Sequence, residues 1–424
     1  MKPPQISCQK KYLYLLNNLG GIKPKLVVRE GDKVKTGSPL FFDKLKPEVK
    51  WASPSSGVVT SIHFGARRII EKIEISVEDK KPESYKSFSS SELNAADREA
   101  VMKNILDACI FPLIRQRPFN KVANPNDVPR DIFVSAYNTA PLSVNVSKVI
   151  LNNKDEFQAG LTALSKLTGG SVYLSSQKPM EFDNVTNVTI EGPHPAGNVG
   201  IQIHHIKPIN PGEVIWTVNA QHVITIGKLF QNGQYDPGCI VSIGGSGSSN
   251  PQTVRALTGS SIGSLLKDQL LNGSQRIISG DVLTGKRVSS DDYLGFYDSS
   301  VAIINDDVKR PFLGMLAVGS SSTKYSLTNT FLSTGTKEFD FTTSQNGELR
   351  AIVPLNAWEK MLPMDILPNP LYRAILAHDI EEMEQLGIWE CDDEDFALCS
   401  FACPSKIDVG GVIRDGLDLL ERDS

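Results

Sequence analysis

The sequence is short of cysteine and has no long apolar run, and each shortage excludes a class of protein. Its 424 residues include six cysteines. These are scattered except for the last three, which does not fit the disulfide framework of a small secreted domain. A membrane-spanning helix needs about 20 mostly apolar residues in a row. The best stretch, residues 214–230, is interrupted by Asn219, Gln221, His222 and Lys228, so we predict one or two buried strands there.

The chain also lacks an excess of charge of either sign. Its formal net charge is −4, with 22% charged and 40% hydrophobic residues, an ordinary composition for a globular protein. A nucleic-acid surface usually shows a concentrated basic face, so we expect no nucleic-acid partner. Residues 1–4 do not begin an apolar secretory segment, and we expect a reducing, cytoplasmic environment.

The pattern of apolar residues and turns predicts a multidomain α/β chain of four units. Residues 1–95 carry short strands separated by Gly and Pro turns, typical of a small barrel or sandwich. Residues 96–237 alternate strand, helix and strand, which favours an α/β layer with parallel pairing. A small sheet crossed by one helix, a β-grasp arrangement, is predicted for residues 238–350. Residues 351–424 are predicted to be helical, with helices at 371–386 and 412–420.

The tail holds part of an iron–sulfur motif. Cys399 and Cys403, followed by Pro404, have the final spacing of a ferredoxin cluster motif. The two upstream ligand positions are occupied by Phe396 and Asp393, and Cys391 is out of step. Three thiolates cannot complete the four ligands of a [4Fe–4S] cluster, so we interpret Cys391, Cys399 and Cys403 as the remnant of a cluster site and predict no bound metal.

Two further places are candidate ligand sites. The segment Gly192, Pro193, His194, Pro195 and Gly197 predicts a rigid turn that holds a histidine near the end of a strand, where ligands of α/β layers bind. No Cys or carboxylate spacing completes a zinc site around this histidine.

The second place is the charged stretch from Lys44 to Trp51. Lipoyl and biotinyl carriers place their modified lysine at a hairpin tip between two such turn-and-strand units. The residues around Lys44 predict an irregular loop without a clear apex, so a solvated lysine is favoured and a carrier lysine is the alternative.

Several motifs in order along the chain resemble those of one family, the A subunits (NqrA) of the sodium-translocating NADH:quinone reductase. The C subunit of the related ferredoxin:NAD reductase complex bears clusters, which accounts for the remnant cysteines. The opening, residues 1–21, departs from the family pattern. The matching segments are residues 29–34, 53–57, 65–68, 115–122, 192–197, 226–230, 362–368, 393–399 and 403–404.

The resemblance implies a fold and a role. The fold would be a biotinyl/lipoyl-like barrel, a Rossmann-like domain, a soluble-ligand-binding β-grasp domain and a C-terminal helical domain. The role would be that of a peripheral subunit on the cytoplasmic side of the bacterial inner membrane. It would dock on integral partners of a six-subunit complex, especially the B subunit in the membrane.

In such complexes electrons pass from NADH through FAD, iron–sulfur, FMN and riboflavin centres on other subunits to ubiquinone, and sodium is expelled. The NqrA subunit is expected to hold no tight cofactor and no catalytic residue, and to associate with ubiquinone. The weak candidates for quinone contact are the 192–197 turn and the loop from Lys44 to Trp51. Two alternatives remain open: a lipoyl-type carrier and an iron–sulfur electron-transfer subunit.

Overall fold

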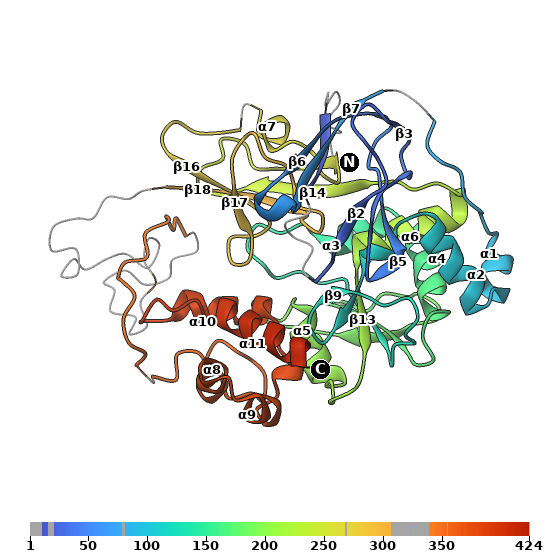
Figure 1. Ribbon diagram of the computed structural model, residues 1–424. Helices are drawn as coiled ribbons and strands as arrows, with labels where there is room; N and C mark the ends of the chain where they lie inside the picture. Colours follow the sequence, from blue (N-terminus) through green and yellow to red (C-terminus); the bar gives the residue numbers. More distant parts are fainter. Residues whose placement is uncertain are drawn as a thin grey trace.

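The computed structural model describes residues 11–15, 21–78, 81–267, 269–306, 325, 339–353 and 355–423, and the unusual opening segment lies largely outside them (Figure 1). The N-terminal unit has two small sheets around one apolar core. Phe41 and Trp51 are fully buried in this core, and their rings stack with centroids 4.8 Å apart. One sheet contains β1 (Lys11–Leu15), β7 (Ile70–Val77), β6 (Gly57–Phe64) and β3 (Lys33–Val34), and the other β2 (Pro24–Leu26), β4 (Pro39–Asp43) and β5 (Lys46–Ala52).

Lys44 lies at the tip of a tight hairpin. Asp43 of β4 pairs with Lys46 of β5, so Lys44 and Leu45 form a two-residue turn. The Asp43 carboxylate accepts hydrogen bonds from the backbone N–H groups of Lys23 and Leu45, each at 3.0 Å. The prediction of an irregular loop is therefore wrong, because the side chain of Asp43 replaces the glycine or asparagine that usually marks such a turn.

The second unit is a six-stranded sheet with the order β12-β11-β10-β13-β8-β9. The first four strands are parallel, and β8 and β9 are antiparallel to their neighbours. The strands are β8 (Ile114–Arg117), β9 (Lys121–Val122), β10 (Ile132–Ser135), β11 (Val172–Ser176), β12 (Thr186–Thr189) and β13 (Ile215–Asn219). The helices are α1 (Ser90–Ala95), α2 (Arg98–Asp107), α3 (Val146–Leu151), α4 (Lys154–Ser165), α5 (Val199–Ile206) and α6 (Ala220–Asn232), with a short 3-10 turn, η2 (Phe111–Leu113).

Residues 214–230 contain a strand and a helix, where one or two strands were predicted. The β13 strand ends at Asn219, whose side chain accepts a hydrogen bond from the backbone N–H of Gln221 and so caps α6. The helix ends at Gly233, which has a left-handed φ of 63°. A continuous apolar run does not distinguish a buried strand from a buried helix, and the cap at Asn219 was the missed signal.

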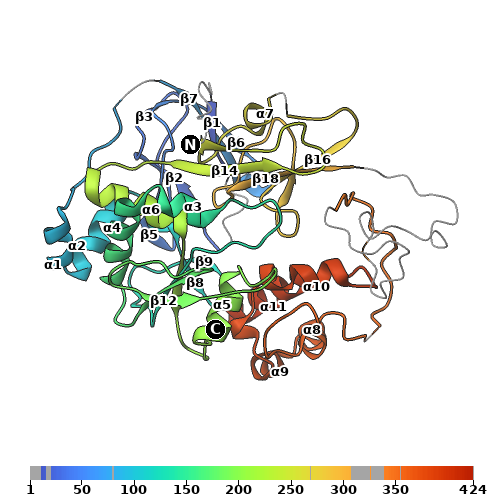
Figure 2. The same cartoon turned by 180° about the vertical axis from the view of Figure 1, so that it is seen from behind.

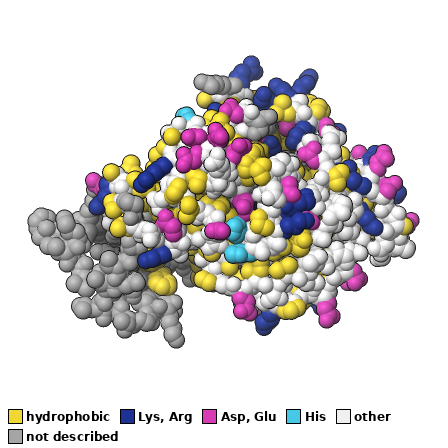
Figure 3. All heavy atoms as spheres, turned by 90° about the horizontal axis from the view of Figure 1, so that it is seen from below, with side chains coloured by type: hydrophobic (Ala, Val, Ile, Leu, Met, Phe, Trp, Pro, Cys, Tyr) yellow, Lys and Arg dark blue, Asp and Glu magenta, His cyan; other side chains and the backbone are white. Residues whose placement is uncertain are grey.

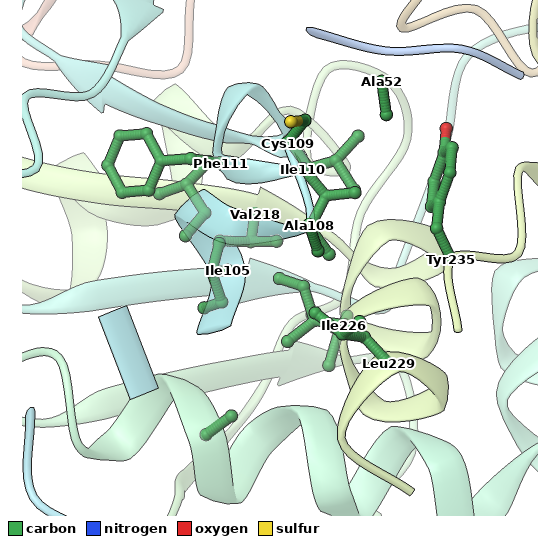
Figure 4. Packing of buried hydrophobic residues seen from close by; sticks show 14 of the residues in the cluster. Ala52, Ile105, Ala108, Cys109, Ile110, Phe111, Val218, Ile226, Leu229 and Tyr235 are labelled. Carbon is green, nitrogen blue, oxygen red and sulfur yellow. The ribbon is translucent and has the colours of Figure 1, made fainter. Parts of the chain in front are cut away.

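Helices α4 and α6 touch through two glycines. A Cβ atom on Gly160 would lie 2.1 Å from the Val223 carbonyl oxygen, and one on Gly227 would lie 1.7 Å from that of Glu156. The far end of α6 is tied to the segment leading from the barrel, because the Phe88 N–H donates to the Phe230 carbonyl at 2.6 Å. Figure 4 shows the apolar cluster around α6, which includes Val218, Ile226 and Leu229 and extends to Ala52 of the barrel.

The third unit is a five-stranded sheet with the order β15-β14-β18-β16-β17. A one-turn helix, α7 (Ile262–Leu265), begins at Ser261, whose hydroxyl accepts from the Ser264 N–H. A sheet and one short helix were predicted for residues 238–350, and both are present in the described part of this range. The strands are β14 (Gly238–Gly244), β15 (Gln252–Leu257), β16 (Gln275–Ser279), β17 (Lys286–Val288) and β18 (Ser300–Asn305).

The C-terminal unit is helical and lies against α5 in both views (Figures 1 and 2). The predicted helix at 371–386 is in fact two helices, because His378 adopts a left-handed φ of 56° between them. When the whole molecule is seen from below, acidic and basic side chains are interspersed on its surface (Figure 3). The elements are α8 (Pro368–Ala377), α9 (Ile380–Gln385), α10 (Ala397–Ala402), α11 (Val409–Asp423) and the 3-10 turns η3 (Ile388–Glu390) and η4 (Asp393–Phe396).

One buried arginine joins this unit to the six-stranded sheet. Arg117, at the end of β8, is 1% exposed and lies among three carboxylates of the segment 392–395, which we call the acidic segment. Its Nη2 atom is 2.6 Å from Glu394 and 3.1 Å from Asp392, and its Nη1 atom is 3.3 Å from Asp395. Arg414 of α11 contacts Asp392 from the other side. The acidic segment is therefore held between a strand of one unit and a helix of the other.

Replacing Arg117 with methionine should destabilise the protein by about 3–5 kcal/mol, because three carboxylates lose a buried partner. Chemical denaturation measures the loss, and limited proteolysis should show the C-terminal unit released first. The matched control is Lys103→Met, which removes an exposed ion pair with Asp107 and should cost at most about 0.5 kcal/mol. Equal effects of the two substitutions would contradict the role of the contact between Arg117 and the acidic segment, which we call the clamp, in attaching the C-terminal unit.

Replacing Gly227 with alanine should destabilise the fold by about 1–3 kcal/mol, because the added methyl group forces α4 and α6 apart. On helix propensity alone the same change would stabilise by about 1 kcal/mol, so the sign of the measured change decides. Gly169→Ala is the control, since a Cβ there meets nothing within 4 Å.

Candidate functional site

A cavity of about 340 Å³ lies where the second, third and fourth units meet. It opens at the carboxyl ends of β10 and β13, at Ser135 and Asn219. From β10 the chain moves outward to β11 and β12, then returns to place β13 on the other side of β10. Ligands of open α/β sheets bind at such a reversal of strand order. Polar lining residues include Arg115, Asn138, His194, Asn198, Asn219, His222, Asp281, Asp298 and Glu394.

The 192–197 turn forms one wall. His194 Nδ1 is 3.1 Å from the Thr139 hydroxyl, which accepts a hydrogen bond from the Gly197 N–H at 2.8 Å. Gly197 fits closely, because a Cβ atom would lie 2.4 Å from the Thr139 nitrogen. Among the residues that the structure describes, none pairs with the buried Nε2 of His194, and burial lowers the pKa of the imidazole. A neutral imidazole whose Nδ1 accepts from Thr139 carries its proton on Nε2.

The second wall combines aromatic and charged groups. The Arg115 guanidinium lies 4.8 Å from the centroid of the Tyr297 ring, and the Tyr297 hydroxyl donates to the Pro112 carbonyl at 2.9 Å. The His222 ring is 6.0 Å from the Tyr297 ring. Burial lowers the pKa of His222 to about 4, so this imidazole is neutral at neutral pH.

The acidic segment supplies part of the third wall. Glu394 lines the cavity, and its carbonyl oxygen accepts from Asn198 Nδ2 at 3.1 Å. Burial raises the pKa of Asp395 to about 8 against the opposing effect of Arg117. For Asp392, burial acts in the same direction, but Arg117 and Arg414 together lower the pKa below its usual value. The cavity wall thus includes the clamp that attaches the C-terminal unit.

The structure brings only part of the predicted site together. His194 and Gly197 line the cavity, Gly192 and Pro193 are exposed beside it, and Pro195 is buried. Lys44 and Trp51 are outside the cavity lining: the lysine is exposed at its hairpin tip and the tryptophan lies in the barrel core. Quinone contact at any of these residues stays a prediction.

The other lining residues were missed for separate reasons. Asn219 and His222 fall in the segment predicted as strand, and polar residues directly after a strand were the available signal. Asp281 and Asp298 come from loops of the third unit that carry no recognisable motif. The lining is mostly polar, whereas a quinone pocket was expected to be mostly apolar.

The tail cysteines are buried. Cys399 donates to the Trp358 carbonyl at 3.5 Å and Cys391 to that of Gly387 at 3.6 Å. Burial raises the pKa of Cys399 to about 12. Within the described ranges there is no group of three or more His, Cys, Asp or Glu side chains that could hold a metal ion. The interpretation as a cluster remnant stays a prediction.

Among the helices of the described part of the chain, none combines the length and the apolar character needed to cross a membrane.

Comparison with known proteins matches three parts of the chain to models of one family. Residues 5–78 match the NqrA N-terminal barrel-sandwich hybrid domain, residues 96–235 the NqrA second alpha/beta domain, and residues 240–290 the NQRA C-terminal domain. A crystal structure of an NAD+-reducing [NiFe]-hydrogenase aligns with a TM-score of 0.37 at 13% identity, over 50% of this chain and 47% of that one.

Relatives match over nearly the whole length. The A subunit of the Na(+)-translocating NADH-quinone reductase of Saccharophagus degradans is 40% identical over 95% of this chain and 92% of that protein. The Pasteurella multocida protein of the same name is 38% identical with the same coverage. That of Histophilus somni is 36% identical over 100% and 97%. Identity of this extent, together with the three matched domains, shows that the chain belongs to the NqrA family, the A subunits of Na+-translocating NADH-quinone reductases.

Proposed function

We propose that this chain is a peripheral subunit of a Na+-translocating NADH:ubiquinone reductase, on the cytoplasmic side of the bacterial inner membrane. It would support electron transfer from NADH to ubiquinone, coupled to sodium export, with FAD, FMN, riboflavin and iron–sulfur centres on other subunits. The name of its full-length relatives supports this role. Docking on the integral membrane subunits, especially the B subunit, is part of the proposal.

Within that role, we propose that the cavity beside the 192–197 turn receives a quinone headgroup. The observation that carries this proposal is His194, which lines a cavity of about 340 Å³ and whose buried Nε2 has no hydrogen-bond partner among the described residues. A quinone ring presents two carbonyl oxygens that accept hydrogen bonds, and side-chain donors stand on several walls. The polar lining suits the headgroup, while an isoprenoid tail would extend out of the cavity.

We also propose finer fold assignments for the units. The strand order β12-β11-β10-β13 supports a Rossmann-like second unit, since it repeats the 3-2-1-4 order of that fold. The two small sheets and the hairpin at Lys44 support a lipoyl-like barrel, and the five-stranded sheet with α7 a β-grasp unit. Domain limits at 1–95, 96–237, 238–350 and 351–424 belong to the same proposal.

Replacing His194 with glutamine should weaken the binding of a short-chain ubiquinone about tenfold, because a hydrogen bond of about 1.4 kcal/mol is lost. Equilibrium titration of the full-length chain measures it. The control is His205→Gln on α5, where the imidazole contacts the Pro363 carbonyl outside the cavity. Unchanged affinity of the His194 variant would remove the turn from the quinone site.

Co-expressed with the integral subunits, the chain should purify together with them. Prepared alone, it should contain no stoichiometric iron or flavin, and its intact mass should match the sequence. A visible band bleached by dithionite would favour the iron–sulfur alternative at Cys391, Cys399 and Cys403. Added lipoyl mass on Lys44 would favour the carrier alternative, which the hairpin geometry at that residue admits.

A further inference from the structure

Asp298 enters the cavity from the loop between β17 and β18, with one carboxyl oxygen occupied. The Ser279 hydroxyl donates to Asp298 Oδ2 at 2.6 Å. Ser279 is 2% exposed, and its own oxygen accepts from the Gly295 N–H at 3.0 Å. The serine oxygen keeps a second lone pair, so Ser279 donates to Oδ2 when Asp298 is ionised. As long as Ser279 donates to Oδ2, a proton carried by Asp298 lies on Oδ1.

The Oδ1 atom is placed beside a glycine of the cavity lining. A Cβ atom on Gly280 would lie 3.4 Å from Asp298 Oδ1, and Gly280 lines the cavity together with Asp298. Gly280 has a left-handed φ of 97°, a conformation that favours glycine, so this side of Oδ1 stays free of a side chain. Asp298 thus lines the cavity with Oδ2 held by Ser279 and with Oδ1 next to the backbone of Gly280.

We propose that Asp298 determines which oxidation state of the quinone the cavity prefers, binding the quinone when it is protonated and the quinol when it is ionised. This inference rests on the proposed function of the cavity as a quinone site. It assigns a specificity role to a residue of the third unit, across the cavity from the 192–197 turn, and it involves ligand binding without any electron-transfer step.

The chemistry of the two ligands explains the selection. Quinone carbonyl oxygens only accept hydrogen bonds, so they are matched by the Oδ1–H of a protonated carboxyl group. Quinol hydroxyls donate, so they are matched by the Oδ1 of a carboxylate, a charge-assisted acceptor. In the mismatched pairs, two donors or two acceptors face each other, and one group loses its hydrogen bond to the protein.

The surroundings of Asp298 raise its pKa above the usual value of an aspartate. Burial is the main cause, the Ser279 hydrogen bond opposes it, the neighbouring Asp281 raises the pKa further, and Lys286 and the Gly295 N–H lower it. Rising pH therefore converts the donor form into the acceptor form. The other titratable side chains lining the cavity are Arg115, Tyr137, His194, His222, Asp281, Tyr297 and Glu394.

The test is the pH dependence of binding of ubiquinone-1 and of its quinol, titrated separately and without oxygen into the full-length chain between pH 4.5 and 8.5. The affinity for the quinone should fall and that for the quinol should rise with pH. The ratio of the two should change about tenfold per pH unit near the pKa of Asp298, the limit for one coupled proton.

Asp298→Asn is the decisive variant, since an amide keeps one protonation state throughout this pH range. It should bind both ligands, with a ratio that no longer depends on pH. Asp291→Asn, an exposed residue of the same unit outside the cavity lining, should keep the wild-type dependence. Repeating the same titrations in the His194→Gln background removes any contribution of the His194 imidazole to the pH dependence.

Two negative results have different meanings. If both ligands bind and the ratio is independent of pH in the wild type, or remains pH-dependent in Asp298→Asn, the role of Asp298 is wrong and the quinone site stands. If neither ligand binds the wild-type chain at any pH, the proposed quinone site itself fails.

Discussion

The buried guanidinium of Arg117 is the contact on which the arrangement of the units depends. It ends a strand of the six-stranded sheet and pairs with three of the four consecutive acidic side chains of the acidic segment, which burial alone would push toward protonation. Removing charges from water is costly unless geometry and hydrogen bonds compensate. The compensation requires both units in place, so the C-terminal helices have one favourable position on the sheet.

The same contact shapes the cavity. Glu394 belongs to the clamp and also to the cavity wall, and its carbonyl oxygen is bonded to Asn198 at the start of α5. His204, further along α5, bonds Glu390 through Nδ1 at 2.8 Å and accepts from the Asp365 N–H through Nε2 at 3.0 Å. The helix that follows the 192–197 turn is therefore fixed along its length by the C-terminal unit. A site assembled from three units in this way exists only in the folded whole.

Much of the fold was predictable, because local patterns reported it directly. The alternation of strand and helix in residues 96–237 and the helical character of residues 351–424 follow from the pattern of apolar residues and turns. The structure of residues 214–230 was not predictable, because burial of both faces removes the apolar periodicity that distinguishes a strand from a helix. The hairpin at Lys44 was missed because its turn is made by an aspartate side chain. In the candidate site, His194 carried a sequence signal, whereas Asp298 depends on Ser279 and Gly280, contacts that only the folded third unit creates.

The touching backbones of α4 and α6 have a mechanical consequence. Gly160 lies against Val223 and Gly227 against Glu156 so closely that a Cβ atom would collide with a carbonyl oxygen, so the two helices form one tightly packed unit. The 13 residues of α6 span about 20 Å, from Asn219 at the cavity to the Phe230 carbonyl that holds the segment leaving the barrel. One straight element therefore joins the wall of the cavity to the attachment point of the N-terminal unit.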